Sequence, residues 1–124
     1  IYDVKILDNN RLYAVGYTTS LDFPTTSGVY KTTTTSADVF VYAIDLNTNS
    51  LLFSTFLGGT NSEIGYGIDI ASNTIIICGQ TNSLNFPVTP GAFSTTFNGG
   101  NQDGFVAGLS INGNSLQFST FVGG

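Results

Sequence analysis

The chain has 124 residues and a net charge of −5 at pH 7, with three basic residues, one cysteine and no histidine. So few basic residues cannot neutralise a row of phosphates, which excludes nucleic acid as a partner. No apolar run approaches the roughly 20 residues that cross a bilayer, so we expect no membrane insertion. Aromatic residues make up 13% of the chain, more than a disordered linker carries, and this predicts a folded domain.

The first half of the chain predicts four short β-strands, and no segment shows a helical period. Apolar and polar residues alternate at the start, and a continuous apolar run follows after a turn. A long polar loop, residues 18–37, then separates the first two strands from the last two. The predicted strands are 2–6, 12–15, 40–46 and 51–57.

The second half predicts the same elements, with strands at 65–70, 75–78, 105–111 and 116–122 and a long loop at 81–102. The run 75–78 is apolar throughout, which is typical of a strand buried on both faces. Cys78 lies in this run and aligns with Val15, so we expect a small buried core residue there. Asn112-Gly113 predicts a tight hairpin turn.

The two halves are copies of one another. Residues 16–28 return as 79–91, and residues 38–59 return as 103–124 with 13 of 22 positions identical. The offset changes from 63 to 65 residues between these segments, so one loop carries an insertion. Each copy ends in Gly-Gly, which we interpret as a sharp turn. A repeat of this period predicts a supersecondary unit that stacks on copies of itself.

Four antiparallel strands repeated with turns between them describe a β-propeller blade, and propellers close with about four to eight blades. We therefore predict an all-β fold of two four-stranded antiparallel blades, residues 1–59 and 60–124. Two blades cannot close a ring, and each would leave an apolar face in water. The blades are accordingly expected to belong to a larger propeller, completed by the same parent chain or by other copies.

Both copies carry a shared pattern around Asp-Phe-Pro or Asn-Phe-Pro, Asp-x-Phe-Val and Phe-Ser-Thr-Phe-(Leu/Val)-Gly-Gly. This pattern resembles the SBBP β-propeller repeat family and covers nearly the whole chain. The resemblance implies a multi-bladed propeller within a large secreted or cell-surface protein, and it implies no particular reaction or ligand. Val88 and Asn85 depart from the usual Thr and Asp of the family, without consequence for the expected fold.

Few residues in the chain could carry out chemistry. The lack of histidine removes the commonest general base and zinc ligand, so we expect neither an enzyme nor a cofactor. Asp38 and Asp103 occupy the same place in the two copies and are expected to accept hydrogen bonds from backbone amides of the long loops. Asn101 and Asp103 are a weak candidate for calcium, because no glutamate completes the ligand set.

The long loops and the Gly-Gly segments should lie on one side of the blades, where binding residues are usually found. Phe23-Pro24 and Phe86-Pro87 lie in these loops, either as plugs that hold each loop on its blade or as an exposed platform for sugar. The candidate ligand-binding residues are Tyr17, Thr18, Asp22, Gln80, Thr81 and Asn85.

The sequence favours a non-enzymatic structural or adhesion module, secreted or at the cell surface, that binds a protein or glycan partner. A two-blade lectin whose copies close a ring is an alternative. A subunit of an extracellular filament or surface layer is another, since low charge and many Thr and Asn residues suit it.

Overall fold

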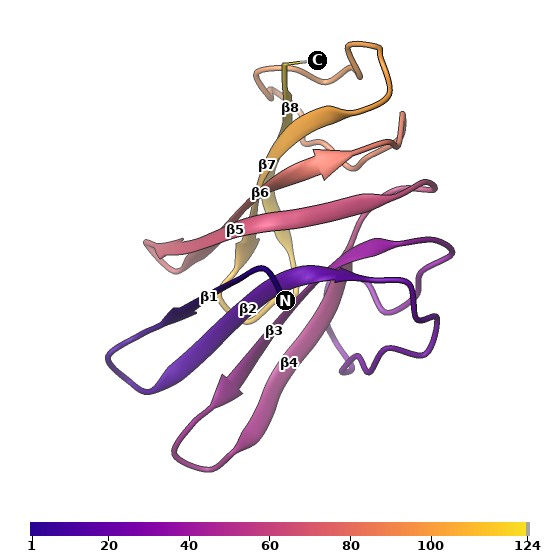
Figure 1. The fold of residues 1–124 in the computed structure, drawn as a ribbon. Helices are drawn as coiled ribbons and strands as arrows, with labels where there is room; N and C mark the ends of the chain where they lie inside the picture. Colours follow the sequence, from indigo (N-terminus) through magenta and orange to yellow (C-terminus); the bar gives the residue numbers. More distant parts are fainter. Residues whose placement is uncertain (124) are drawn as a thin grey trace.

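The computed structural model describes residues 1–123 and contains two four-stranded antiparallel sheets (Figure 1). Strands β1–β4 form the first sheet and β5–β8 form the second, each in chain order. The strands are β1 (Asp3–Ile6), β2 (Arg11–Thr18), β3 (Asp38–Asp45), β4 (Ser50–Leu57), β5 (Glu63–Ala71), β6 (Thr74–Thr81), β7 (Asp103–Ser110) and β8 (Leu116–Val122). The predicted all-β fold of two four-stranded antiparallel sheets is confirmed. Residues 1–123 contain no helix of the length and apolar character needed to cross a membrane.

The two sheets pack face to face, with β5 lying across β1, β2 and β3 of the first sheet (Figure 1). We call the face of each sheet that contacts the other sheet its inner face, and the opposite face its outer face. Residues of strands β2 to β8 that point inward fill one continuous core between the inner faces, as expected for pleated strands. From the first sheet this core takes Tyr13, Val15, Val39, Val41, Ala43, Phe53 and Leu57, and from the second Ile68, Ile75, Ile77, Phe105, Ala107, Leu109 and Phe121.

The repeat shows that the two inner faces are different faces of the same unit. Val15 on the inner face of the first sheet corresponds to Cys78, which lies on the outer face of the second. Conversely, Phe105 on the inner face of the second sheet corresponds to Phe40 on the outer face of the first. The sheets are therefore stacked head to tail, with one face of the unit against the opposite face of its copy.

This arrangement corrects the prediction that Cys78 is a buried core residue. Val15 is fully buried because the second sheet covers it, whereas the thiol of Cys78 is exposed because no further sheet lies on that side. The strand predicted to be buried on both faces is therefore covered on one face only, where Ile75 and Ile77 are buried.

Each long loop folds back along the last strand of its own sheet. Thr26 N donates to Ser54 O at 3.1 Å, and Thr89 N donates to Ser119 O at the same distance. Further along the same edges, Phe56 N donates to Lys31 O at 2.9 Å and Phe121 N to Ser94 O at 3.1 Å. The loops thus cover the edges of β4 and β8, which would otherwise present unpaired backbone groups.

The phenylalanine of each Phe-Pro pair holds its loop on the sheet. The Phe23 ring lies 4.8 Å from that of Phe40, and the Phe86 ring lies 4.4 Å from that of Phe105. Phe86 is almost completely buried. The interpretation of these residues as plugs is confirmed for both loops, since each ring packs on a phenylalanine of its own sheet.

Candidate functional site

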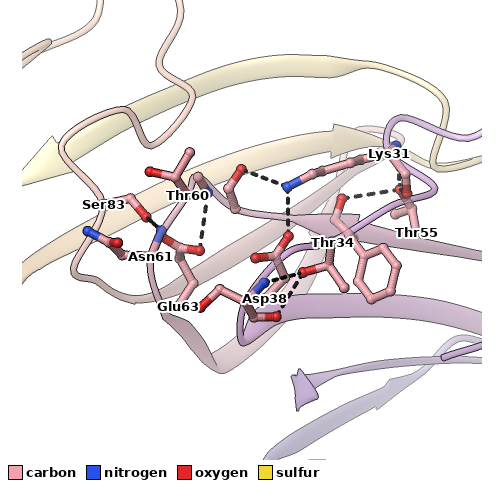
Figure 2. Close-up of polar contacts among 12 residues, drawn as sticks. Lys31, Thr34, Asp38, Thr55, Thr60, Asn61, Glu63 and Ser83 are labelled. Carbon is pink, nitrogen blue, oxygen red and sulfur yellow. Dashed lines mark hydrogen bonds and ion pairs between the residues drawn. The ribbon is translucent and has the colours of Figure 1, made fainter. Parts of the chain in front are cut away.

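Several buried polar side chains lie at the junction between the sheets, where residues 58–62 lead from β4 into β5 (Figure 2). Glu63 is the first residue of β5, and its side chain is fully buried. One carboxylate oxygen accepts a hydrogen bond from Gly59 N at 3.1 Å, and the other accepts one from Thr81 Oγ1 at 2.6 Å. Glu63 N in turn donates to Ala37 O at 2.8 Å. A single residue therefore ties the first long loop, the linker and β6 together.

Lys31 and Asp38 form an ion pair next to this carboxylate. Lys31 Nζ reaches from the long loop to within 2.7 Å of Asp38 Oδ2 and donates to Gly58 O at 3.1 Å (Figure 2). The Asp38 side chain is fully buried, so the ammonium compensates a charge that would otherwise be costly in the interior. The second carboxylate oxygen, Oδ1, accepts no hydrogen bond from the described residues.

The Gly-Gly sequence is required here by close approach and not by a sharp turn. Neither Gly58 nor Gly59 has the positive backbone φ angle that Gly113 and Gly123 have. A Cβ atom on Gly58 would collide with the carboxylates of Asp38 and Glu63, and one on Gly59 would lie 2.5 Å from Ser83 Cβ. The expected turn function of these glycines is wrong for Gly58 and Gly59, and Gly124 lies outside the described residues.

Two residues of the second long loop complete the junction. Asn85 Oδ1 accepts hydrogen bonds from Thr60 N at 3.0 Å and from Thr60 Oγ1 at 3.1 Å. Ser83 Oγ accepts one from Asn61 N at 2.8 Å (Figure 2). These contacts fix the linker against the start of the second long loop, so that every segment entering the junction is held by a side chain.

Burial raises the pKa of the Glu63 carboxyl above its ordinary value. Hydrogen bonds from Ser83, Thr81 and the Gly59 amide act in the opposite direction, and the nearby negative charge of Asp38 adds to the rise. The junction thus contains two neighbouring buried carboxyl groups and one ammonium. Both carboxyl groups are engaged by loop and linker atoms, an arrangement suited to holding segments together.

An open groove of about 420 Å³ lies above this junction. Hydroxyl, amide and ammonium groups supply much of its wall, and the Tyr30 ring and Pro87 add apolar surface. The long loops and the Gly-Gly segment therefore meet at one surface, as the sequence predicted. The residues that line the groove are Tyr30, Lys31, Thr33, Thr34, Thr35, Gly58, Gly59, Thr60, Asn85 and Pro87.

Two of the six predicted ligand-binding residues, Thr81 and Asn85, lie in the junction. Thr81 is fully buried and bound to Glu63, so it holds the structure together. Asn85 is exposed and lines the groove. Of these two, only Asn85 is accessible to a ligand.

The other four predicted residues lie elsewhere. Thr18 and Asp22 are linked through Ser20, whose N donates to Thr18 Oγ1 at 3.0 Å and whose Oγ donates to Asp22 Oδ1 at 2.5 Å. Gln80 is half-buried on the outer face of the second sheet. The six candidates accordingly do not form one site.

Tyr17, the remaining candidate, belongs to an exposed cluster of three tyrosines. Its ring stacks on that of Tyr2 at 6.0 Å, and Tyr2 lies 5.2 Å from the ring of Tyr66. All three rings are partly exposed. This cluster is an aromatic surface that the sequence pattern did not bring together, because its members come from β2, β5 and the residue before β1.

Asp103 occupies the position of Asp38 in the second sheet. Its Oδ2 accepts a hydrogen bond from Asn98 N at 2.6 Å, which confirms the expected role of capping a loop amide. Asp38 instead pairs with Lys31, so the same expectation is wrong for that residue. Asn101, the other half of the weak calcium candidate, is exposed, and the described residues include no group of three acidic, Cys or His side chains that could hold a metal.

Lys31, Gly58 and Glu63 were missed as site residues. Ser94 stands where the repeat would place a second Lys31, so the repeat carries no signal for the ion pair. Glu63 has no counterpart either, because the position that aligns with it precedes Ile1.

A scan against protein-family models finds no match to the chain, and a search of the curated proteins finds none either.

Proposed function

We propose that the chain is a pair of blades from an extracellular β-propeller of the SBBP repeat type, serving as a non-enzymatic structural and adhesion module. The observation that carries this proposal is the head-to-tail stacking of the two sheets. A unit that packs one face on the opposite face of its copy leaves two unlike faces free, and further units satisfy them in the same way.

The exposed residues on those two free faces support the assignment. Ile6 on the outer face of the first sheet is 54% exposed. Its counterpart is Ile70, which pairs with Ile75 as Ile6 pairs with the equivalent Leu12, and Ile70 packs against the core. Val122 on the outer face of the second sheet is 47% exposed, whereas its counterpart Leu57 is fully buried. Apolar side chains that are buried in one copy and exposed in the other are expected where a neighbouring blade is missing.

The chemistry of the junction supports a structural role. The carboxylates of Asp38, Glu63 and Asp103 are all buried and accept hydrogen bonds from a lysine, a loop or the linker. No histidine is present in the chain to act as a general base near neutral pH. A secreted or cell-surface location follows from the proposed repeat class and is part of the proposal.

A tandem chain tests the blade assignment. Two copies are joined through Thr-Asn-Ser-Glu, so that Gly124 leads to Ile1 of the next copy as Gly59 leads to Ile64. The glutamate can then accept hydrogen bonds from Thr18 and Ser20, as Glu63 does from the corresponding Thr81 and Ser83 of the second copy. We expect the tandem chain to unfold at a higher temperature than the single chain. Equal melting temperatures would contradict the proposal.

The matched control for this experiment is a tandem chain joined by Gly-Ser-Gly-Ser. It has the same length but lacks the glutamate that reproduces the junction. We expect it to be stabilised less than the chain joined by Thr-Asn-Ser-Glu, because one buried set of hydrogen bonds is lost.

Carbohydrate binding, as in the lectin alternative, is favoured by the tyrosine cluster. Aromatic rings stack on the apolar faces of sugars, and the three rings of Tyr2, Tyr17 and Tyr66 lie together on the surface. A glycan array probed with the chain and with Tyr17→Ala tests this candidate, and Gln80→Ala serves as a control outside the cluster. Binding that is lost in Tyr17→Ala alone supports a lectin, and the absence of any bound glycan contradicts it.

A further inference from the structure

The two outer faces of the chain correspond, position by position, to the two faces already packed together inside it. On the outer face of the second sheet, Val106, Phe118 and Val122 stand where Val41, Phe53 and Leu57 stand in the first sheet. The latter three are buried in the core between the sheets. The second sheet thus presents to solvent a version of the surface that the first sheet buries.

The outer face of the first sheet is the matching partner. Val4, Ile6 and Leu51 stand where Ile68, Ile70 and Leu116 pack into or against the core. All three are large apolar side chains that are exposed. The chain therefore carries both halves of its internal interface a second time, on opposite sides.

The first long loop contacts the second sheet across the internal interface. The second long loop has no further sheet on its corresponding side. Tyr30 N donates to Gly113 O of the second sheet at 2.8 Å, and the Tyr30 side chain packs against the core. Burial accordingly raises the pKa of the Tyr30 hydroxyl. Phe93, which occupies the Tyr30 position in the second copy, is 87% exposed. An aromatic ring held in this way on an open face marks the place of a neighbouring unit.

Charge at the interface is also complementary between copies. Inside the chain, Lys5 Nζ of β1 lies 3.4 Å from Asp69 Oδ1 of β5, and these residues occupy the same position of the repeat. A second copy stacked in the same sense would place the Asp69 of one copy opposite the Lys5 of the next. The exposed pair contributes little stability, but opposite charges at this position help to set the register.

We propose that a second copy of this chain docks on the outer face of the second sheet through its own first sheet, in the geometry of the internal interface. The inference rests on the proposed function, since it takes the sheets to be stackable blades. It goes beyond that function by naming the partner and both faces. The contact is heterologous, so each copy has one face of each kind to offer.

One difference from the internal interface is the turn that faces the phenylalanine. Inside the chain this is the β7–β8 turn, whereas between copies it would be the β3–β4 turn. Gly113 has a φ of +75° and lies directly against the Phe53 ring, where a Cβ atom would collide with it. Thr48 occupies the corresponding position in the first copy. The contact between Phe118 of one copy and the turn of the next must therefore be looser than its internal counterpart, which predicts an association weaker than the packing within the chain.

The experiment measures molar mass by light scattering over a range of concentrations for four chains. The unaltered chain should gain mass as the concentration rises. Ile6→Glu disables one face and Val122→Lys disables the other, and each variant alone should remain a monomer. Both positions are exposed, so the variants should fold, and circular dichroism checks that they do. Leu84→Glu, at an exposed loop residue away from the faces, should associate like the unaltered chain.

A mixture of the two variants decides the sense of the contact. Each variant retains the face that the other has lost, so an equimolar mixture should form dimers and nothing larger. Association of either variant alone, or a mixture that stays monomeric, would overturn the proposal, as would an unaltered chain that is monomeric throughout. If the tandem chain is stabilised while separate copies stay monomeric, the self-association fails and the blade assignment stands.

Discussion

The two sheets have nearly the same sequence but bury it differently, and the differences are confined to positions that a neighbour would cover. Val15 is buried and Cys78 is exposed, and Tyr30 is packed while Phe93 is free. Two positions are buried whether or not a second sheet lies on their face: Phe40 and Phe56 on the outer face of the first sheet are buried, as are Phe105 and Phe121 on the inner face of the second. Comparing the burial of equivalent residues in the two copies therefore separates the residues that stabilise one sheet from those that join two sheets.

The largest expected effect compares Phe53 with Phe118. These residues occupy the same position, and they are 4% and 38% exposed. Phe53→Ala should lower the free energy of unfolding by about 3–5 kcal/mol, because it opens a cavity in the core between the sheets. Phe118→Ala should cost less than half as much in the monomer. Chemical denaturation of both variants measures the difference, and equal losses would contradict the assignment of the faces.

The second comparison sets Lys31 against Ser94. Lys31→Met leaves the buried Asp38 carboxylate without its cation, and we expect a loss of about 3 kcal/mol. Ser94→Met changes the matching position, where no charge is compensated, and should cost clearly less. The double variant Lys31→Met with Asp38→Asn should recover part of the loss. A double-mutant cycle by denaturation provides the measurement, and strictly additive effects would show that the pair is not coupled.

A third comparison separates backbone strain from close contact at glycine. Gly91 and Gly113 both have positive φ angles, but only Gly113 has a neighbour, the Phe53 ring. Gly91→Ala should cost about 1–2 kcal/mol from the left-handed backbone alone. Gly113→Ala should cost more, because the ring must also move. Thermal unfolding of the two variants tests the order, and a smaller loss at Gly113 would contradict the packing described for the interface.

A smaller effect is expected at the junction. Asn85→Ala removes the acceptor for Thr60 N and Thr60 Oγ1 and should cost about 1 kcal/mol. Asp22→Ala alters the corresponding residue of the first copy, which holds no linker, and should have a smaller effect. The comparison is made by denaturation at neutral pH. If Asp22→Ala proves the more damaging, the linker contacts are not what Asn85 contributes.

The smallest expected effect is a dependence on pH. Burial raises the pKa of Glu63 above 4.5, so the folded chain binds this proton more tightly than the unfolded chain. Its contribution to stability therefore increases as the pH falls through the raised pKa, and the gain is complete below 4.5. The pKa of Asp69 is lowered by hydrogen bonding from the Ile70 amide and by Lys5, so its contribution is lost below 3.8. The two windows do not overlap.

Glu63→Gln isolates the first of these windows. The difference in unfolding free energy between this variant and the unaltered chain should change between neutral pH and pH 4.5, in the direction that favours the unaltered chain at the lower pH. A difference that stays constant over this range would show that the Glu63 carboxyl titrates normally in the folded chain.

Much of the fold follows from local patterns in the sequence. Alternating residues and turns placed all eight strands, and β8 has the predicted bounds of 116–122. Strand β1 is one residue shorter than predicted, and the other strands are longer or shifted by a few residues. Backbone pairing extends β2 and β6, for example, past the apolar runs to Thr18 and Thr81. Strand pairing does not depend on hydropathy, so these extensions leave no mark in the apolar pattern.

The site was harder to predict, because its residues come from segments far apart in the chain. Glu63 lies next to Asp38, and Lys31 reaches both Asp38 and the linker, although no local pattern connects them. The exposure of Cys78 also escaped prediction, since burial on that face depends on a second unit and not on the strand itself. The repeat predicted the strands of one unit well, but it predicted the contacts between units poorly.

The central claim, that the outer faces are blade interfaces, is tested most directly by the thiol of Cys78. In the tandem chain joined by Thr-Asn-Ser-Glu, the first copy's Cys78 lies at the new interface and the second copy's Cys78 stays on an open face. Alkylation should proceed in two phases of equal amplitude, one as fast as in the single chain at low concentration and one at least ten times slower. Two thiols that react at the same fast rate would contradict the account.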